Sequence, residues 1–345
     1  MNPELEREVA DLVAKSGITF NDDKIREILK TALALGIDGA DRLNLKITAS
    51  ALAEMRSAFA MFAPYASVPK VTVFGSARTK PDDPSYLLTK QVARALADTG
   101  WMVATGAGPG IMQAAAEGAG REASIGVSIR LPFEERPNDV IHDDPKHVSM
   151  KYFFTRKLML VKESKGFIAV PGGFGTLDET LELLTLQQTG KAEPTPIVLL
   201  DSPEGTFWQA FETFIQTEVA ARGLVASDDL SRVLITSDPS LAVSEIIGFW
   251  RNYHSIRWVG KRLVMRLNHV PTPEQISQLN DRFSYCLSEG TIAATAPLKP
   301  EVSNNEHLEL ARLVMTWNPF KVGDLHHLVR AVNEFLPNGD NPPAP

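Results

Sequence analysis

Apolar residues change their spacing twice along the chain. Residues 1–68 carry apolar side chains at intervals of three and four positions, which is typical of amphipathic helices. Residues 69–251 alternate short apolar runs with helical patterns, and residues 252–336 hold a smaller set of strand and helix patterns. We therefore expect a helical extension, a large α/β domain and a small α+β domain, followed by a disordered tail over residues 337–345.

The apolar runs of residues 69–251 predict the fold class. Each run ends in a turn and is followed by an amphipathic helix, which is the pattern of a doubly wound, mainly parallel, Rossmann-like sheet. Such sheets bind ligands at the carboxyl ends of their strands. The predicted strands are Val71–Phe74, Trp101–Thr105, Ile125–Ile129, His147–Met150, Phe167–Val170, Ile197–Leu200 and Val233–Thr236.

Residues 252–336 contain an internal repeat. Arg262–Met265 (RLVM), followed by Asn268, recurs fifty residues later as Arg312–Met315, followed by Asn318. Each copy precedes an amphipathic helix, so we expect a small α+β domain of ferredoxin-like type. Such a domain serves either in oligomerisation or as a small-molecule regulatory module, and we favour oligomerisation.

The strand Phe167–Val170 leads into a turn that predicts a phosphate site. Its glycines can adopt backbone angles closed to other residues, and a helix is expected to begin at Thr176. The free N–H groups at a helix start, with the helix dipole behind them, bind anions. The expected phosphate ligands are Gly172, Gly173, Gly175 and Thr176.

Glu179 follows this turn and has two interpretations. Its carboxylate could face a bound group across the turn. Alternatively, Thr176 and Glu179 satisfy the T-x-x-E capping box, in which Glu179 only returns a hydrogen bond to the Thr176 amide.

The turn Gly106–Gly110 narrows the choice of ligand. Its glycines are spaced G-x-G-x-G, which differs from the G-x-G-x-x-G of dinucleotide sites, and the sequence contains no P-loop motif. A mononucleotide fits these constraints. Met112 and Phe174, near the two turns, are candidates for packing on a base, although a methionine at a helix start is more often core.

Composition and charge exclude several classes. The net charge of −7 over 345 residues argues against a nucleic-acid surface. No apolar run reaches the length of about 18 residues that a membrane span needs, and the first residues are charged, so we expect a cytoplasmic protein without a membrane anchor. The single cysteine, Cys286, is expected in the core, and no Cys/His cluster has the spacing of a metal site.

The motif Pro171–Glu179 (PGGFGTLDE), with the upstream pair Arg156-Lys157 and the run Thr105–Met112 (TGAGPGIM), resembles the Lonely Guy (LOG) family. Members of this family are nucleoside 5'-monophosphate phosphoribohydrolases that were long mislabelled lysine decarboxylases. The resemblance covers residues 70–250. The first glycine turn of the family usually reads GGG, and Ala107 here replaces its middle glycine.

The resemblance implies hydrolysis of the N-glycosidic bond of AMP or of a cytokinin riboside 5'-monophosphate, giving free base and ribose 5-phosphate. It assigns catalysis to Arg156 and Glu179, and it implies no metal or organic cofactor and a homodimer or larger homo-oligomer. We expect Glu179 to stabilise charge on the ribose and to orient water, and Arg156 to position the substrate. Further substrate-binding candidates are Ser76, Arg78, Gly108, Met112 and Lys157.

Two other functions stay open. A related Rossmann-like protein could bind a nucleotide or carry the molybdenum cofactor without cleaving anything, but the presence of both Arg156 and Glu179 favours the enzyme. A decarboxylase would need a lysine that forms a Schiff base, and nothing singles out Lys151, Lys157 or Lys162. The sequence does not choose the base, and it places His142 and His147 in a surface loop.

Overall fold

The computed structural model describes residues 3–131 and 136–336. The chain divides into two compact units, residues 1–57 and 58–345. The predicted disordered tail, 337–345, lies outside the described residues. In the part of the chain described, no helix has both the length and the apolar character needed to cross a bilayer.

The first unit is helical, as its apolar spacing predicts. It contains α1 (Pro3–Lys15) and α2 (Asp22–Ile37), and α3 (Arg42–Phe62) begins in this unit and continues into the next. The end of the extension at residue 68 stays a prediction.

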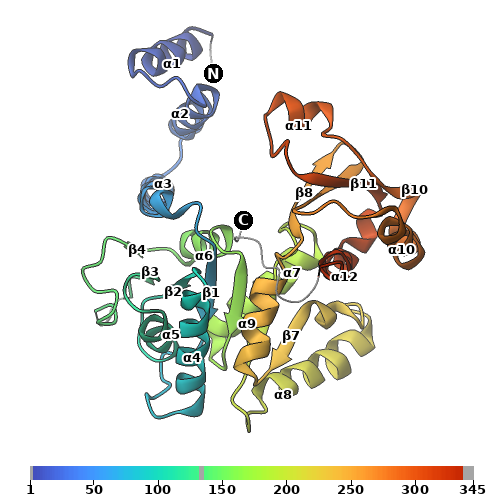
Figure 1. Cartoon of the computed structure of the whole chain (residues 1–345). Coiled ribbons are helices and arrows are strands. Elements are labelled where there is room, and N and C mark those ends of the chain that lie inside the picture. Colours follow the sequence, from blue (N-terminus) through green and yellow to red (C-terminus); the bar gives the residue numbers. More distant parts are fainter. Residues whose placement is uncertain (1–2, 132–135, 337–345) are drawn as a thin grey trace. The chain divides into compact units, whose positions relative to one another are not determined.

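The second unit contains a seven-stranded parallel sheet with the order β4-β3-β2-β1-β5-β6-β7 (Figure 1). The central strands β1, β2, β5 and β6 are buried throughout, because helices cover both faces. Every strand predicted for the α/β domain is present, so the doubly wound fold class is confirmed. The strands are β1 (Lys70–Phe74), β2 (Met102–Thr105), β3 (Ser124–Ile129), β4 (His147–Met150), β5 (Gly166–Ala169), β6 (Ile197–Leu200) and β7 (Val233–Thr236).

Helices connect these strands by crossovers, and α4, α5 and α9 pack together on one face of the sheet (Figure 1). The strand order reverses between β1 and β5, so the topological switch point lies between the carboxyl ends of these two strands. The helices are α4 (Pro84–Asp98), α5 (Ile111–Ala119), α6 (Phe153–Lys162), α7 (Phe174–Gln188), α8 (Phe207–Phe214), which continues as the π-helical turn Ile215–Val219, and α9 (Pro239–Gly248).

The C-terminal part forms a second, antiparallel sheet with the order β10-β11-β9-β8. When the short helix between the last two strands is set aside, chain order and sheet order give a ββαββα arrangement, which is the ferredoxin-like topology begun at a hairpin instead of at the first βαβ unit. The first strand, β8, has no counterpart among the predicted elements. The elements are β8 (Tyr253–Val259), β9 (Arg262–Leu267), α10 (Pro273–Phe283), β10 (Leu287–Ala294), α11 (Lys299–Ser303), β11 (Ala311–Trp317) and α12 (Leu325–Asn333).

The internal repeat coincides with a local two-fold arrangement. The equivalent residues Val264 and Val314 pair directly across the central strands β9 and β11. Two copies related by a two-fold axis through that pair would give this register. The repeat is therefore visible in the structure as two antiparallel central strands, each followed by a helix.

One continuous apolar core joins the two sheets. Leu263 and Leu313 of the antiparallel sheet belong to the same buried cluster as Val71 and Ile168 of the parallel sheet. Trp250 Nε1 also donates a hydrogen bond to the carbonyl oxygen of Lys165 at 2.8 Å. The C-terminal sheet is thus packed on the α/β domain.

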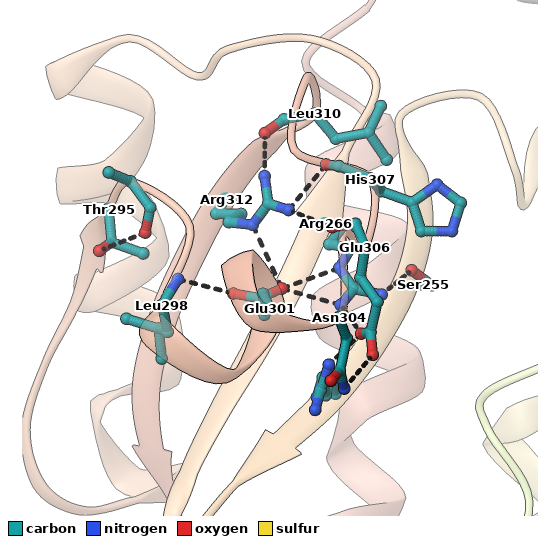
Figure 2. A network of polar contacts seen from close by, with 12 residues as sticks. Ser255, Arg266, Thr295, Leu298, Glu301, Asn304, Glu306, His307, Leu310 and Arg312 are labelled. Atoms are coloured by element: carbon teal, nitrogen blue, oxygen red, sulfur yellow. Dashed lines mark hydrogen bonds and ion pairs between the residues drawn. The ribbon is translucent and has the colours of Figure 1, made fainter.

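A buried ion network lies on the other face of the antiparallel sheet (Figure 2). Glu301 Oε1 accepts from Nε and Nη2 of Arg266 at 3.0 and 2.8 Å and from Nε of Arg312 at 3.3 Å, and Oε2 accepts from the Leu298 amide at 3.0 Å. Although burial opposes ionisation, these bonds hold the pKa of Glu301 below its ordinary value. The network fixes α11 against β9 and β11.

Candidate active site

A cavity of about 1250 Å³ lies at the carboxyl ends of β1, β2, β3 and β5, beside the switch point. Its walls include residues 73–78, 106–109 and 172–179, so the three predicted turns do converge. All predicted site residues line this cavity except Lys157. Among the described residues, no group of three or more His, Cys, Asp or Glu side chains is placed to hold a metal ion.

The glycines after β5 serve a different purpose from the one predicted. None of Gly172, Gly173 and Gly175 adopts a left-handed φ, so the expected special backbone angles are wrong. A Cβ on Gly172 would lie 2.2 Å from Thr176 Oγ1, so that glycine is needed for close packing. Apart from the neighbouring residues and the backbone of α7 itself, no described atom lies within 4 Å of a Cβ built on Gly173 or Gly175. Their missing side chains leave the backbone accessible from the cavity.

α7 begins at Phe174, two residues before the predicted start at Thr176. Gly173 is the N-cap, and its carbonyl oxygen accepts from the Leu177 amide at 3.1 Å. The capping box of Thr176 and Glu179 is therefore not formed, because both residues lie inside the helix. The first-turn N–H groups, which have no intrahelical acceptors, face the glycine turn, as an anion site requires.

The side chain of Arg156 contacts both a strand and a helix. It is 8% exposed, its Nε donates to the carbonyl oxygen of Val127 in β3 at 2.8 Å, and its Nη1 lies 3.3 Å from Glu179 Oε1. A Cβ on Gly106 would lie 2.0 Å from Arg156 Nη2. The first glycine of the second turn is thus required because the guanidinium packs on it.

Glu179 pairs with Arg156 and has a shifted ionisation. Burial raises its pKa to about 7, while Arg156 and Lys157 oppose the shift and Asp178 and Glu182 add to it. Since a group that titrates near neutral pH can both accept and release a proton, the environment of Glu179 suits general acid–base chemistry.

Known proteins are similar to this chain in sequence. A family described as "Possible lysine decarboxylase" matches residues 110–246. The cytokinin riboside 5'-monophosphate phosphoribohydrolase LOG of Oryza sativa subsp. japonica is 32% identical over 133 residues, which are 38% of this chain and 50% of that protein. The cytokinin riboside 5'-monophosphate phosphoribohydrolase of Mycobacterium marinum is 29% identical over 162 residues, 46% of this chain and 83% of that protein.

The α/β part of this chain is similar to LOG proteins. The chain spans half the length of the rice relative. Among solved structures, the molybdenum cofactor binding protein from Rippkaea orientalis is 23% identical, with 50% of this chain and 91% of that protein covered and a TM-score of 0.35.

Lys157 lies outside the cavity, contrary to the expectation that it contacts substrate. Its Nζ contacts Asp178 Oδ2 at 2.8 Å and Glu182 Oε2 at 2.5 Å. Although burial opposes it, the hydrogen bonds to these carboxylates raise the pKa of Lys157. Among the described residues, none that lines the cavity is a lysine. A decarboxylase that works through a Schiff base, as the older description of LOG proteins implies, needs a lysine in its active site.

The turns after β1 and β2 complete the wall. The Ser76 amide donates to the carbonyl oxygen of Pro171 at 3.2 Å, which ties the first turn to the phosphate turn. A Cβ on Gly108 would lie 2.6 Å from Met112 Cε, so Met112 packs over this glycine turn. Arg78 is exposed at the cavity mouth, and Phe174 is 93% exposed.

Sequence reasoning missed a polar pair in the cavity wall. Ser128 Oγ lies 2.9 Å from His147 Nε2, and Ser128 lines the cavity. His147 was expected on the surface, but its ring packs beside Gly126, and burial, followed by His142, lowers its pKa. The position of Ser128 near the carboxyl end of a predicted strand was the available signal. Arg136 and Phe153 also line the cavity without having been predicted.

Proposed function

We propose that this protein hydrolyses the N-glycosidic bond of nucleoside 5'-monophosphates, releasing a free base and ribose 5-phosphate. The observation that carries the proposal is the buried contact of 3.3 Å between Arg156 and Glu179 in a cavity that also contains the amino-terminal end of α7. AMP and cytokinin riboside 5'-monophosphates are the proposed substrates, in line with the names of the LOG relatives.

The glycine turn and the first turn of α7 are the proposed phosphate site. The amides of Gly173, Gly175 and Thr176 would donate to the phosphate oxygens, and the helix dipole would add a favourable field. The exposed guanidinium of Arg78 stands at the same cavity and would contribute charge. These contacts would require the 5'-phosphate and disfavour nucleosides.

Glu179 and Arg156 would then act on the ribose and the base. As the bond from C1' to the base nitrogen breaks, its electron pair goes to the base and positive charge develops on the ribose ring. The carboxylate of Glu179 would stabilise that charge and accept a proton from the water that attacks C1', and one proton ends on the departing base. Arg156 stays charged, so its role is to position and stabilise charge, because it is a poor proton donor.

The region proposed for the base is mainly apolar. Met112, Ile129, Leu131 and Pro137 line the cavity on the side of β2 and β3. Apolar walls distinguish bases weakly, and a larger N6-substituted adenine would gain contact area there. We therefore expect activity on several bases with differences of tenfold or less between related purines.

We also propose a homo-oligomer. Phe154 and Leu158 of α6 and Leu181 of α7 are each about half exposed, at 56%, 48% and 45%, and Phe174 at the start of α7 is 93% exposed. Exposed apolar side chains on two helices that contact each other are typical of an interface. Static light scattering of the full chain should give at least twice the monomer mass, and a monomer at micromolar concentration would overturn this proposal.

The test of function is a chromatographic assay of base release. The purified protein is incubated with AMP, GMP, IMP, CMP, UMP and isopentenyl-AMP, and with the matching nucleosides. Release of base from the monophosphates and not from the nucleosides is the expected result. Binding of nucleotides without release of base from any of them would contradict the proposal and favour a carrier.

A further inference from the structure

Three carboxylates project from one turn of α7, and two cations of α6 face them. Arg156 pairs with Glu179, and Lys157, its neighbour in sequence, contacts both Asp178 and Glu182. Arg156 and Glu179 line the cavity, and so does Asp178, whereas Lys157 and Glu182 do not. The dipeptide therefore splits its two charges between the reaction cavity and the outside.

Lys157, Asp178 and Glu182 together set the charge close to Glu179. Asp178 directly precedes Glu179, and Glu182 lies one helical turn after Asp178. Without a cation between them, Asp178 and Glu182 would repel each other and would also act on the carboxylate of Glu179. Lys157, whose side chain is only 15% exposed, is the cation that contacts both of them.

We propose that Lys157 is a positioning residue for the hydrolysis: by neutralising Asp178 and Glu182 from outside the cavity, it keeps Glu179 ionised and paired with Arg156. This inference rests on the proposed function of Glu179. Lys157 acts without touching the substrate, which is consistent with its place outside the cavity wall. The opposing effects of Lys157 and of the two acids on the pKa of Glu179 agree in sign with this role.

The experiment is a titration of the Glu179 carboxyl carbon by NMR of the ¹³C-glutamate-labelled full chain, with the signal assigned from its loss in Glu179→Gln. In Lys157→Met the pKa of Glu179 should rise by about 0.5–1 unit, because two nearby negative charges lose their counterion in a partly exposed setting. Lys157→Arg, the matched control, should titrate like the wild type. The cavity arginines Arg78 and Arg136 are the same in every variant.

A second variant keeps the test independent of the folding of Lys157→Met. Asp178→Asn/Glu182→Gln retains Lys157 and removes both acids, so the pKa of Glu179 should fall by about 0.5 unit or more. Adding Lys157→Met to this pair should raise the pKa of Glu179 again, because the positive charge of Lys157 also acts on Glu179 directly. If Lys157 only ties α6 to α7, Lys157→Met should lower the thermal stability and leave the Glu179 titration unchanged. That result would overturn the proposal.

Activity gives a separate readout. The acidic limb of kcat/KM should move to higher pH in Lys157→Met, with about a fivefold loss at pH 6 and little loss at pH 8.5. An equal loss at every pH would contradict the proposal. A wild-type protein without base release would end the hydrolase assignment, whereas the NMR titration would still decide whether Lys157 controls Glu179.

Discussion

The buried arginine–carboxylate clusters around Glu301 and around Glu179, both in the second unit, have opposite properties. Glu301 is fully buried, its two oxygens accept bonds from two arginines and an amide, and its pKa is held below the ordinary value (Figure 2). Glu179 is 12% exposed, contacts Arg156 at 3.3 Å beside a cavity, and has a pKa raised to about 7.

The number of partners explains this difference. A buried carboxylate whose oxygens are all bonded stays ionised and stabilises one conformation. A buried carboxylate with a single long contact keeps the capacity to exchange a proton or to meet a developing charge. The two clusters should therefore respond differently to the same chemical change, the replacement of Glu by Gln.

The largest effect on stability is expected in the cluster around Glu301. Glu301→Gln leaves Arg266 and Arg312 buried without their shared counterion, so the free energy of unfolding should fall by about 3–5 kcal/mol. Urea unfolding of the full chain measures this change. A loss below about 1 kcal/mol would show that the network does not hold α11 in place.

Glu179→Gln should have the opposite, pH-dependent effect on stability. The folded-state pKa of Glu179, about 7, lies above the ordinary 4.5, so between these values the folded protein binds more protons and its stability falls as pH rises. The variant lacks this penalty and should gain about 1–3 kcal/mol relative to the wild type between pH 5 and pH 8. Thermal unfolding at the two pH values checks the gain, and parallel behaviour of the two proteins would contradict the raised pKa.

Two glycines of the turn after β5 should affect different properties, Gly173 the binding of ligand and Gly172 the packing of the turn. Gly173→Ala meets no described atom and needs no special φ, so the free energy of unfolding should stay within about 0.5 kcal/mol, while the KM for monophosphates rises about tenfold. Gly172→Ala, the matched control, clashes with Thr176 Oγ1 and should lose about 1–3 kcal/mol of stability. An unchanged KM in Gly173→Ala would place the phosphate elsewhere.

The smallest effect concerns the backbone of Ala107, whose φ of 58° lies in the left-handed region that favours glycine. Ala107→Gly relieves about 1 kcal/mol of left-handed strain and loses a similar amount of methyl burial. Differential scanning calorimetry should therefore show a change below about 1 kcal/mol, and a larger gain would mean that the alanine strains the turn more than its burial stabilises it.

The sequence predicted the parallel sheet well because its strands are short, continuous apolar runs bounded by glycine turns. It missed β8, which mixes His254, Ser255 and Arg257 with apolar residues, so no clear alternation marks it. It also placed the start of α7 too late, because Phe174 and Gly175 are poor helix signals although their amides lie in the first turn.

For the site, motif spacing identified residues around the cavity but not which of their side chains enter it. Arg156 and Lys157 are adjacent in sequence, and only the packing of α6 on α7 decides that one side chain enters the cavity and the other stays outside. Likewise, the contact between Ser128 and His147 depends on the parallel pairing of β3 with β4. Such contacts between distant segments have no local signature.

The most direct test of the central claim is a comparison of AMP hydrolysis and AMP binding in the wild type and in Glu179→Gln. If Glu179 supplies the catalytic carboxylate, kcat should fall by at least about 100-fold while the Kd for the nucleotide, measured by calorimetry, changes by less than about threefold. A Glu179→Gln variant that binds AMP and turns it over at the wild-type rate would contradict the account.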